Sequence, residues 1–227
     1  MLTVTQAVRQ RRSVRAFLPQ PVKPSTIAEI LEIASWAPSG GNLQPWHVDA
    51  VAGDALAELK ARAQERLASG LESTEFNVYP PDISERHAHR RRRCGEDLYA
   101  SLGIERADKP ARWAQFMNNY ALFGAPCGLF FSLDRSFDRP QWSHLGMFVQ
   151  TIMLLAEERG LATCAQEAWA ALHGTVAAFL ALPEDRILYC GLALGYADPD
   201  HPINGFRTER EPIESFARFH GFQGSET

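Results

Sequence analysis

One segment of the sequence limits the possible folds more than any other, because the helix predicted over residues 143–159 is apolar on nearly every side. One stripe at helical spacing contains Leu145, Phe148, Val149, Ile152 and Ala156. Outside that stripe lie three more apolar side chains, Met147, Met153 and Leu154. A helix that is apolar all round is buried on all sides. We therefore expect a central helix that also packs against a second subunit.

Shorter predicted helices and strands follow one another along the rest of the chain. They predict a single domain, residues 1–227, of the α+β class. Strands are predicted at 46–52, 125–133, 161–165 and 187–194. Helices are predicted at 3–12, at 54–68, at 174–181, and from a capping box of Thr26 and Glu29 to Pro38. Residues 70–120 are less regular, and the polar tail after 204 ends in three phenylalanines.

The composition excludes several classes of function. Lys and Arg number 23 and Asp and Glu 27, and a net charge of −4 gives no general attraction to nucleic acid or to anionic membranes. No window approaches the roughly 18 apolar residues that span a bilayer, and the first residues lack the apolar core of a signal peptide. The four cysteines match no zinc pattern. We expect a cytoplasmic protein without a metal.

A cluster of basic residues follows the first predicted helix and contains Arg11, Arg12, Ser13 and Arg15. Guanidinium groups pair with a phosphate through two hydrogen bonds, and a serine hydroxyl can add a third. The same groups would suit a carboxylate, or would simply form an exposed basic turn.

A polar loop precedes the first predicted strand and contains Pro38, Ser39, Gly40, Asn42 and Gln44. Glycine lets the backbone approach a flat ligand closely, and the amide and hydroxyl groups provide both donors and acceptors. Such a mixture suits the pyrimidine edge of a flavin, whereas the simpler interpretation is a helix-to-strand turn.

Two further segments carry candidate groups. Gln166 and Glu167 follow the strand predicted at 161–165, where a carboxylate could be catalytic, contact a ligand or lie in a solvated turn. Arg207 and Arg210 lie in the tail and offer more cations for a phosphate. The basic run at residues 90–93 favours a solvated helix face over a nucleic-acid site, and its position within residues 70–120 suggests a third option, the edge of a lid over the substrate site. His87 and His89 do not share a helical face, so they predict no metal site.

Together, these motifs resemble the FMN-dependent nitroreductase family in their order and spacing. The resemblance lies in Arg-Arg-Ser-Val-Arg, in Pro-Ser-Gly-Gly-Asn-Leu-Gln-Pro-Trp and in the late Arg-Glu-Pro. It implies a central, mostly antiparallel sheet surrounded by helices, in an intertwined homodimer. It also implies a variable substrate lid at about 70–120 and a C-terminal arm at about 204–227. One departure is Ala165-Gln-Glu-Ala168, where many members have Pro-x-Glu-Gly.

The resemblance also assigns residues to FMN. It implies that Arg11, Arg12 and Ser13 hold the phosphate and ribityl chain, with Arg210 and Arg207 nearby, and that Arg15 lies at the N1/O2 edge of the ring. The segment of Gln166 and Glu167 would present a backbone N–H to N5. The other subunit would cover the flavin with Pro38, Ser39, Gly40 and Asn42, with Gln44 close by.

The implied activity is transfer of hydride from NAD(P)H through FMN to a nitroaromatic or quinone-like acceptor by a ping-pong mechanism. In this mechanism the cofactor carries the chemistry, and no catalytic side chain is required. The alternatives on the same fold are dehalogenation, reduction of an activated double bond and flavin fragmentation. A non-enzymatic flavin-binding or nucleic-acid-associated protein is the remaining alternative.

Overall fold

The computed structural model of the protein describes residues 2–222, and its centre is an antiparallel sheet of the order β1-β2-β4-β3. The strands are β1 (His47–Ala52), β2 (Cys127–Asp134), β3 (Ala162–Gln166) and β4 (Arg186–Gly195). All pairings are antiparallel. The four predicted strands are therefore confirmed to within a few residues, as is the α+β class.

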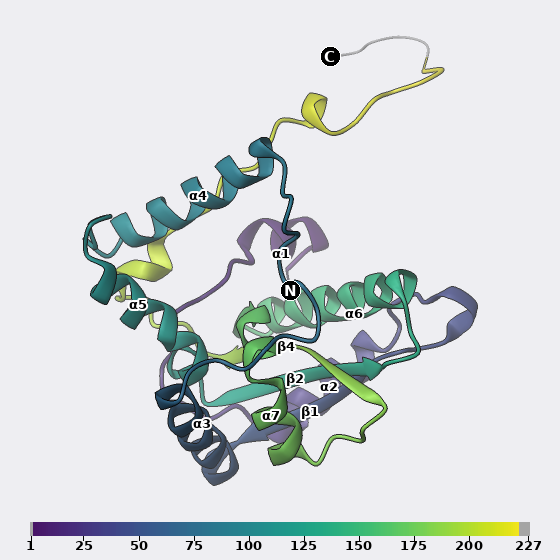
Figure 1. Ribbon diagram of the computed structural model, residues 1–227. Helices are drawn as coiled ribbons and strands as arrows, with labels where there is room; N and C mark the ends of the chain where they lie inside the picture. Colours follow the sequence, from purple (N-terminus) through teal and green to yellow (C-terminus); the bar gives the residue numbers. More distant parts are fainter. Residues whose placement is uncertain (1, 223–227) are drawn as a thin grey trace.

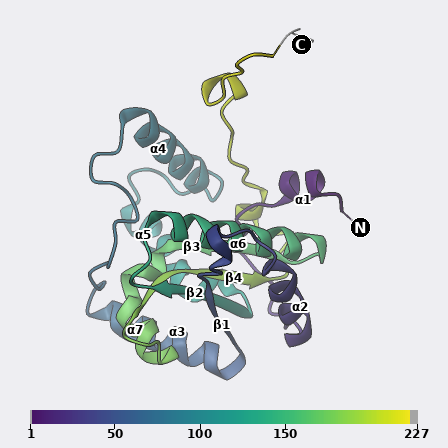
Figure 2. The same cartoon turned by 90° about the vertical axis from the view of Figure 1, so that its right-hand side faces the viewer.

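Helices cover both faces of this sheet (Figures 1 and 2). On one face lie α2 (Pro24–Ala34) and α6 (Arg139–Glu158), and on the other lie α3 (Gly53–Ala68) and α7 (His173–Leu180). Alternate side chains of β2 enter the two cores, since Phe131 packs with α2 and α6 whereas Phe130 packs with α3 and α7. The sheet thus separates two hydrophobic cores.

A β-bulge in β4 changes which way its side chains point. Phe131 of β2 is opposite Cys190, but Ser132 is opposite Leu188, so Tyr189 is the extra residue on β4. Tyr189 and Cys190 therefore both lie on the α6 side although they are consecutive. Bulges are common next to active sites because they redirect a side chain in this way.

The helix that was predicted to be central is α6. Its stripe of five apolar residues is buried against the sheet, as expected. The helix begins four residues earlier than predicted, because Asp138 and Gln141 form a capping box. It ends before Gly160, which has a φ of 68°. Its opposite face is only partly covered in the single chain, and Met147 is 39% exposed.

The N-terminal helices show one wrong prediction. The helix α1 (Val4–Gln10) is capped by Thr3 and Gln6 as a capping box. The helix α2, in contrast, has no side-chain cap and begins at Pro24. Proline suits the first helical turn because its φ is already fixed there. The capping box proposed for Thr26 and Glu29 does not exist, since both residues lie inside the helix.

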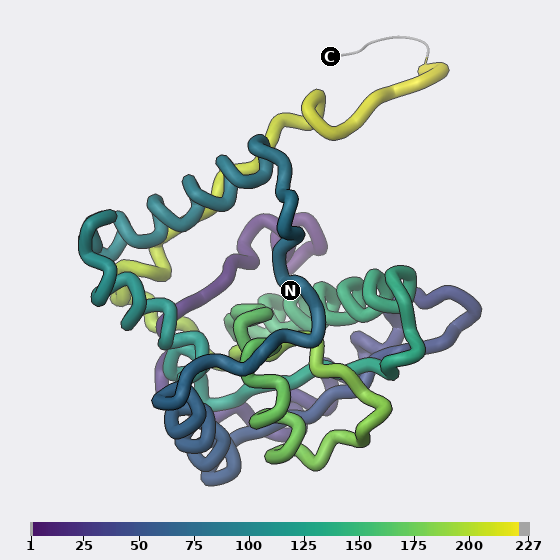
Figure 3. Tube along the Cα trace, viewed as in Figure 1, coloured from purple at the N-terminus to yellow at the C-terminus, as the bar shows by residue number. Residues whose placement is uncertain are grey.

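The less regular region contains two helices, α4 (Glu85–Ala100) and α5 (Lys109–Met117). Figure 3 shows that the segment after residue 204 runs beside α4 and then projects beyond it. Short 3-10 helices complete the described chain: η1 (Gly40–Asn42), η2 (Asn118–Gly124), η3 (Glu167–Leu172), η4 (Pro202–Gly205) and η5 (Ile213–Ser215). Residues 223–227 of the predicted arm lie outside the described residues. No helix within residues 2–222 has the length and apolar character needed to cross a bilayer.

Candidate functional site

Arginines from both ends of the chain line one cavity of about 410 Å³. Its polar lining consists of Arg9, Arg11, Arg12, Ser13, Arg15, Arg207, Thr208 and Arg210. Within residues 2–222, no carboxylate lies within 4.0 Å of any of these guanidinium nitrogens. All six residues predicted from the sequence to hold a phosphate and the flavin edge are therefore brought together.

Backbone hydrogen bonds hold the N-terminal part of this cavity against the sheet. Val14 N donates to Thr163 O of β3 at 3.0 Å, and Ser13 forms a parallel bridge with Thr163. Asn204, which is 4% exposed, accepts from Arg15 N through Oδ1 at 2.9 Å and donates to Ala16 O at 2.8 Å. Asn204 thus joins the two ends of the chain.

The two late arginines have different surroundings. Arg207 donates to the carbonyl oxygens of Arg9 and Gln10 at 3.2 and 3.0 Å, and so satisfies the end of α1. Arg210 donates to Thr208 Oγ1 at 2.6 Å and to Glu209 O at 2.8 Å. Arg207 therefore has a structural role besides lining the cavity.

The electrostatics of the cavity suit an anion. Burial lowers the pKa of Arg11, and the positive charges of Arg210 and Arg207 lower it further. The Nε of Arg12 is buried and has no hydrogen-bond partner within the described residues. Like charges held together with an unpaired buried donor are costly in isolation, and a bound phosphate would relieve both costs.

A second cavity, of about 670 Å³, lies at the other end of β3. It includes Gln166, Glu167, Tyr189 and residues of α6 such as Gln150. Gln166 is 2% exposed, and its Nε2 donates to Asn119 O at 2.7 Å while its Oε1 has no partner within the described residues. Glu167 is exposed to this cavity, and desolvation by the surrounding protein raises its pKa.

The loop predicted to cover a flavin lines neither cavity with any of its residues 38–44. Gly40 N lies 3.3 Å from Nε2 of His144 in α6. The loop is kept in shape by a hydrogen bond from Gln44 N to Ser39 Oγ at 3.0 Å. Asn42 and Gln44 have positive φ values of 56° and 48°. Strained backbone of this kind is common at ligand sites.

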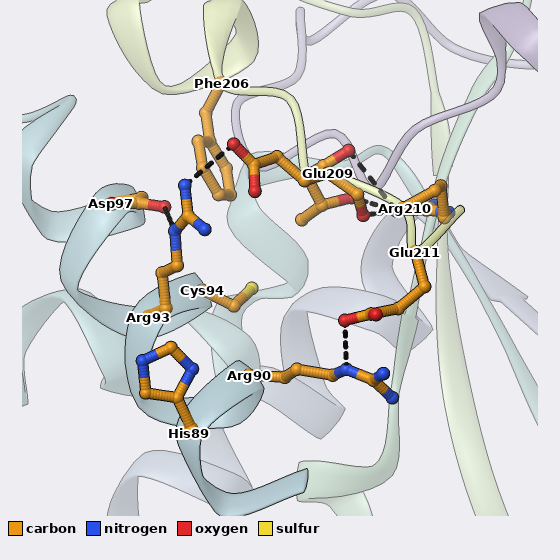
Figure 4. Close-up of a pocket in the computed structure, with 10 residues that line it drawn as sticks. His89, Arg90, Arg93, Cys94, Asp97, Phe206, Glu209, Arg210 and Glu211 are labelled. Atoms are coloured by element: carbon orange, nitrogen blue, oxygen red, sulfur yellow. Dashed lines mark hydrogen bonds and ion pairs between the residues drawn. The ribbon is translucent and has the colours of Figure 1, made fainter. Parts of the chain in front are cut away.

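Two arginines of the basic run of α4 pair with the C-terminal segment (Figure 4), and no residue of the helix is buried, which agrees with the predicted solvated face. Arg90 pairs with Glu211 at 2.6 Å, and Arg93 pairs with Glu209 at 2.8 Å. The two glutamates flank Arg210. No group of metal-ligating residues is present within residues 2–222.

Asn204 and Tyr189 are among the residues that the sequence interpretation did not assign to the site. Asn204 was inside a segment singled out for its arginines, and only its hydrogen bonds to the backbone of Arg15 and Ala16 show that it joins the chain ends. Tyr189 was assigned to a strand, and the bulge that directs it into the cavity has no signal in the sequence.

The antiparallel sheet, its two helical layers and the arginine-lined cavity define a protein that binds an anionic cofactor beside a sheet edge. The sequence profile of the Nitroreductase family matches residues 8–196, and the chain belongs to that family. A 4-nitrobenzoate reductase of Pseudomonas putida is 36% identical over 95% of this chain and 94% of its own length.

Two solved structures are similar over nearly the whole chain. One is an FMN- and NADPH-dependent nitroreductase from Sphigopyxis sp. strain HMH, with a TM-score of 0.95 and 43% identity, covering 97% of this chain and 100% of its own. The other is an FMN-dependent nitroreductase from Mycobacterium smegmatis in complex with NADPH, with a TM-score of 0.90 and 31% identity, covering 96% and 99%.

Proposed function

We propose that this protein reduces nitroaromatic compounds with electrons from NADPH or NADH, using FMN. The chain is an NAD(P)H-dependent FMN oxidoreductase of the nitroreductase family. The observation that carries the proposal is the arginine cavity without a direct carboxylate partner, which fits the phosphate of FMN, beside a second cavity that contains Gln166 and Glu167. NADPH is the favoured donor, because both similar structures are described with it.

The residues of this chain divide the work of holding the cofactor. Arg11, Arg12, Ser13 and Arg210 would bind the phosphate, with Arg207 supporting them through α1. Arg15 would lie at the N1/O2 edge, and a cation there favours the reduced ring. The segment of Gln166 and Glu167 would offer a backbone N–H near N5. Ala165 and Ala168 replace the Pro and Gly of the common family pattern in this segment.

The chemistry itself comes from bound FMN, which accepts hydride from the nicotinamide and passes it to the acceptor. The side chains orient the two substrates in turn over one face and need not transfer a proton.

We propose that two copies of the chain form the complete site. The arm exposes Phe216, Phe219 and Phe222 at 73%, 67% and 80%, which is typical of a surface that another chain covers. The loop of residues 38–44 lines neither the arginine cavity nor the cavity of Gln166 and Glu167 in its own subunit, which suits a role over the partner's flavin. The free thiols of all four cysteines support a cytoplasmic location.

Removing residues 212–227 should weaken the dimer and release FMN, because the three exposed phenylalanines lose their partner. The cut leaves Glu209 and Glu211 in place, so the pairs with α4 remain. Sedimentation at a series of concentrations measures the effect. A variant that carries Ser at Phe216, Phe219 and Phe222 is the matched control and should behave alike. A truncated protein that stays a flavin-loaded dimer would refute the proposed role of the C-terminal arm in the dimer.

The activity is tested with the purified protein, which should be yellow and should oxidise NADPH faster when a nitroaromatic compound is added. Hydroxylamino products distinguish nitro reduction from dehalogenation, reduction of a double bond and flavin fragmentation. A colourless protein that fails to take up added FMN would overturn the proposal. If NADPH is oxidised but a nitroaromatic compound does not increase the rate, one of the alternative reactions on the same fold replaces nitroaromatic reduction as the proposed activity.

A further inference from the structure

One arginine of the basic run in α4 differs from its three neighbours. Arg90, Arg92 and Arg93 each have a carboxylate partner, which is Glu211, Glu85 and Glu209 respectively. Arg91 has no such partner within residues 2–222. Its guanidinium carbon instead lies 3.9 Å from the centre of the Tyr79 ring. The charge of Arg91 is therefore not paired with a carboxylate within these residues, and its guanidinium lies against an aromatic face.

Arg91 also lines the cavity that contains Gln166 and Glu167. It is the single cationic side chain among the lining residues of this cavity. Most of the remaining wall is apolar or aromatic, with Tyr79, Phe116, Tyr120 and Tyr189. A cavity with aromatic walls and one fixed cation has the chemistry to hold a flat ring that carries one negative group.

We propose that Arg91 recognises the carboxylate of an acidic nitroaromatic acceptor, such as a nitrobenzoate. This inference rests on the proposed function, because it names the substrate class of the same site. The Tyr79 ring lies over one face of the guanidinium, and the N–H edge of Arg91 donates to no other group within residues 2–222. That edge matches a planar carboxylate through two parallel hydrogen bonds, while the aromatic walls contact the ring of the acceptor.

A phosphate of the nicotinamide donor would be a second anion that an arginine could bind. The structure favours the acceptor, because a phosphate suits a cluster of several guanidinium groups, as in the separate cavity of Arg11, Arg12 and Arg210 that is proposed for FMN. Arg91, in contrast, stands alone among aromatic side chains. Since donor and acceptor react in separate half-reactions, the two possibilities can be measured independently.

The experiment compares 4-nitrobenzoate with 4-nitrobenzamide, which has nearly the same shape and no charge. In Arg91→Ala, kcat/KM for 4-nitrobenzoate should fall about 10- to 100-fold, as expected for loss of a charged hydrogen bond. The value for 4-nitrobenzamide should change less than about threefold. Arg91→Lys should retain part of the activity with 4-nitrobenzoate that Arg91→Ala loses, since lysine keeps the positive charge but cannot donate the two parallel hydrogen bonds of a guanidinium. Arg92→Ala is the matched control, because Arg92 pairs with Glu85 and does not line the cavity.

Equal losses for both acceptors would overturn the proposal and assign Arg91 a structural role. The proposal would also be overturned if Arg91→Ala slows the reduction of the flavin by NADPH but not by NADH, and leaves kcat/KM for 4-nitrobenzoate unchanged. Arg91 would then bind the phosphate of NADPH that NADH lacks. Binding of benzoate and benzamide, followed through the flavin spectrum, tests Arg91 even if neither nitro compound is reduced. In that case the proposed function fails, whereas a loss of benzoate binding alone in Arg91→Ala still supports the anion site.

Discussion

Replacing Trp169 with Ala is expected to lower the free energy of unfolding by about 3–5 kcal/mol. Trp169 is fully buried and lies between the rings of Tyr120 and Phe130, at centroid distances of 5.5 and 5.1 Å. Its ring also fills the space above Gly191, where a Cβ would lie 2.6 Å from Cδ1 of the indole. The truncation would therefore leave a large cavity that the rigid sheet below cannot close.

The melting temperature should fall by roughly 6–20 °C, given about 2–4 °C per kcal/mol for a chain of this size. Flavin should also be released earlier, because Trp169 anchors the 3-10 helix that begins at Glu167. Trp169→Phe is the control and should cost much less, since the indole Nε1 has no partner within the described residues and no hydrogen bond is lost. A fall of less than 2 °C in Trp169→Ala would contradict this account.

The parts of the fold that could be predicted from the sequence are those whose burial gives a clear pattern. The stripe of α6 repeats at helical spacing, and β2 is an almost continuous apolar run, so both were placed correctly. The start of α6 was missed because its first turn is polar, with Arg139 and Gln141, and its cap is Asp138. A polar first turn gives no periodic hydrophobic signal. Asp138 followed by Gln141 three residues later is nevertheless a capping-box pattern that could have indicated the start of the helix.

The region of α4 could not be predicted because little of its stability comes from burial. No residue of α4 is buried. Its arginines pair with Glu209 and Glu211, more than 100 residues later in the chain. Exposed pairs of this kind contribute little individually, and the sequence alone does not say which charges meet. For the same reason, the sequence does not show that Arg91 lacks a carboxylate partner. This becomes clear only once the partners of the neighbouring arginines are known.

The cavity of arginines was predicted by resemblance rather than by physical pattern. Arg11 and Arg210 are distant in sequence, and nothing in their spacing says that they share a cavity. The structure adds the reason, since Asn204 binds the backbone of Arg15 and of Ala16 and so brings the tail to the first segment. The roles of individual arginines toward FMN stay predictions.

The role of Arg15 is the sharpest of these predictions. Replacing Arg15 with Ala should weaken FMN binding about 10- to 150-fold, which corresponds to loss of one charged hydrogen bond of about 1.5–3 kcal/mol. It should also make the bound flavin harder to reduce, by roughly 30–60 mV for a two-electron couple. The physical reason is that a guanidinium at the N1/O2 edge stabilises the negative charge of the reduced ring.

Arg11→Ala is the matched control, because Arg11 lines the same cavity but is assigned to the phosphate. It should weaken FMN binding to a similar degree and leave the reduction potential unchanged, since the phosphate keeps its charge during reduction. Fluorescence titration with FMN gives the affinity, and equilibration with a reference dye gives the potential. If the flavin has the same reduction potential in Arg15→Ala as in the unchanged protein, Arg15 does not lie at the N1/O2 edge of the ring. A shifted potential in Arg11→Ala would place the ring, rather than the phosphate, beside Arg11.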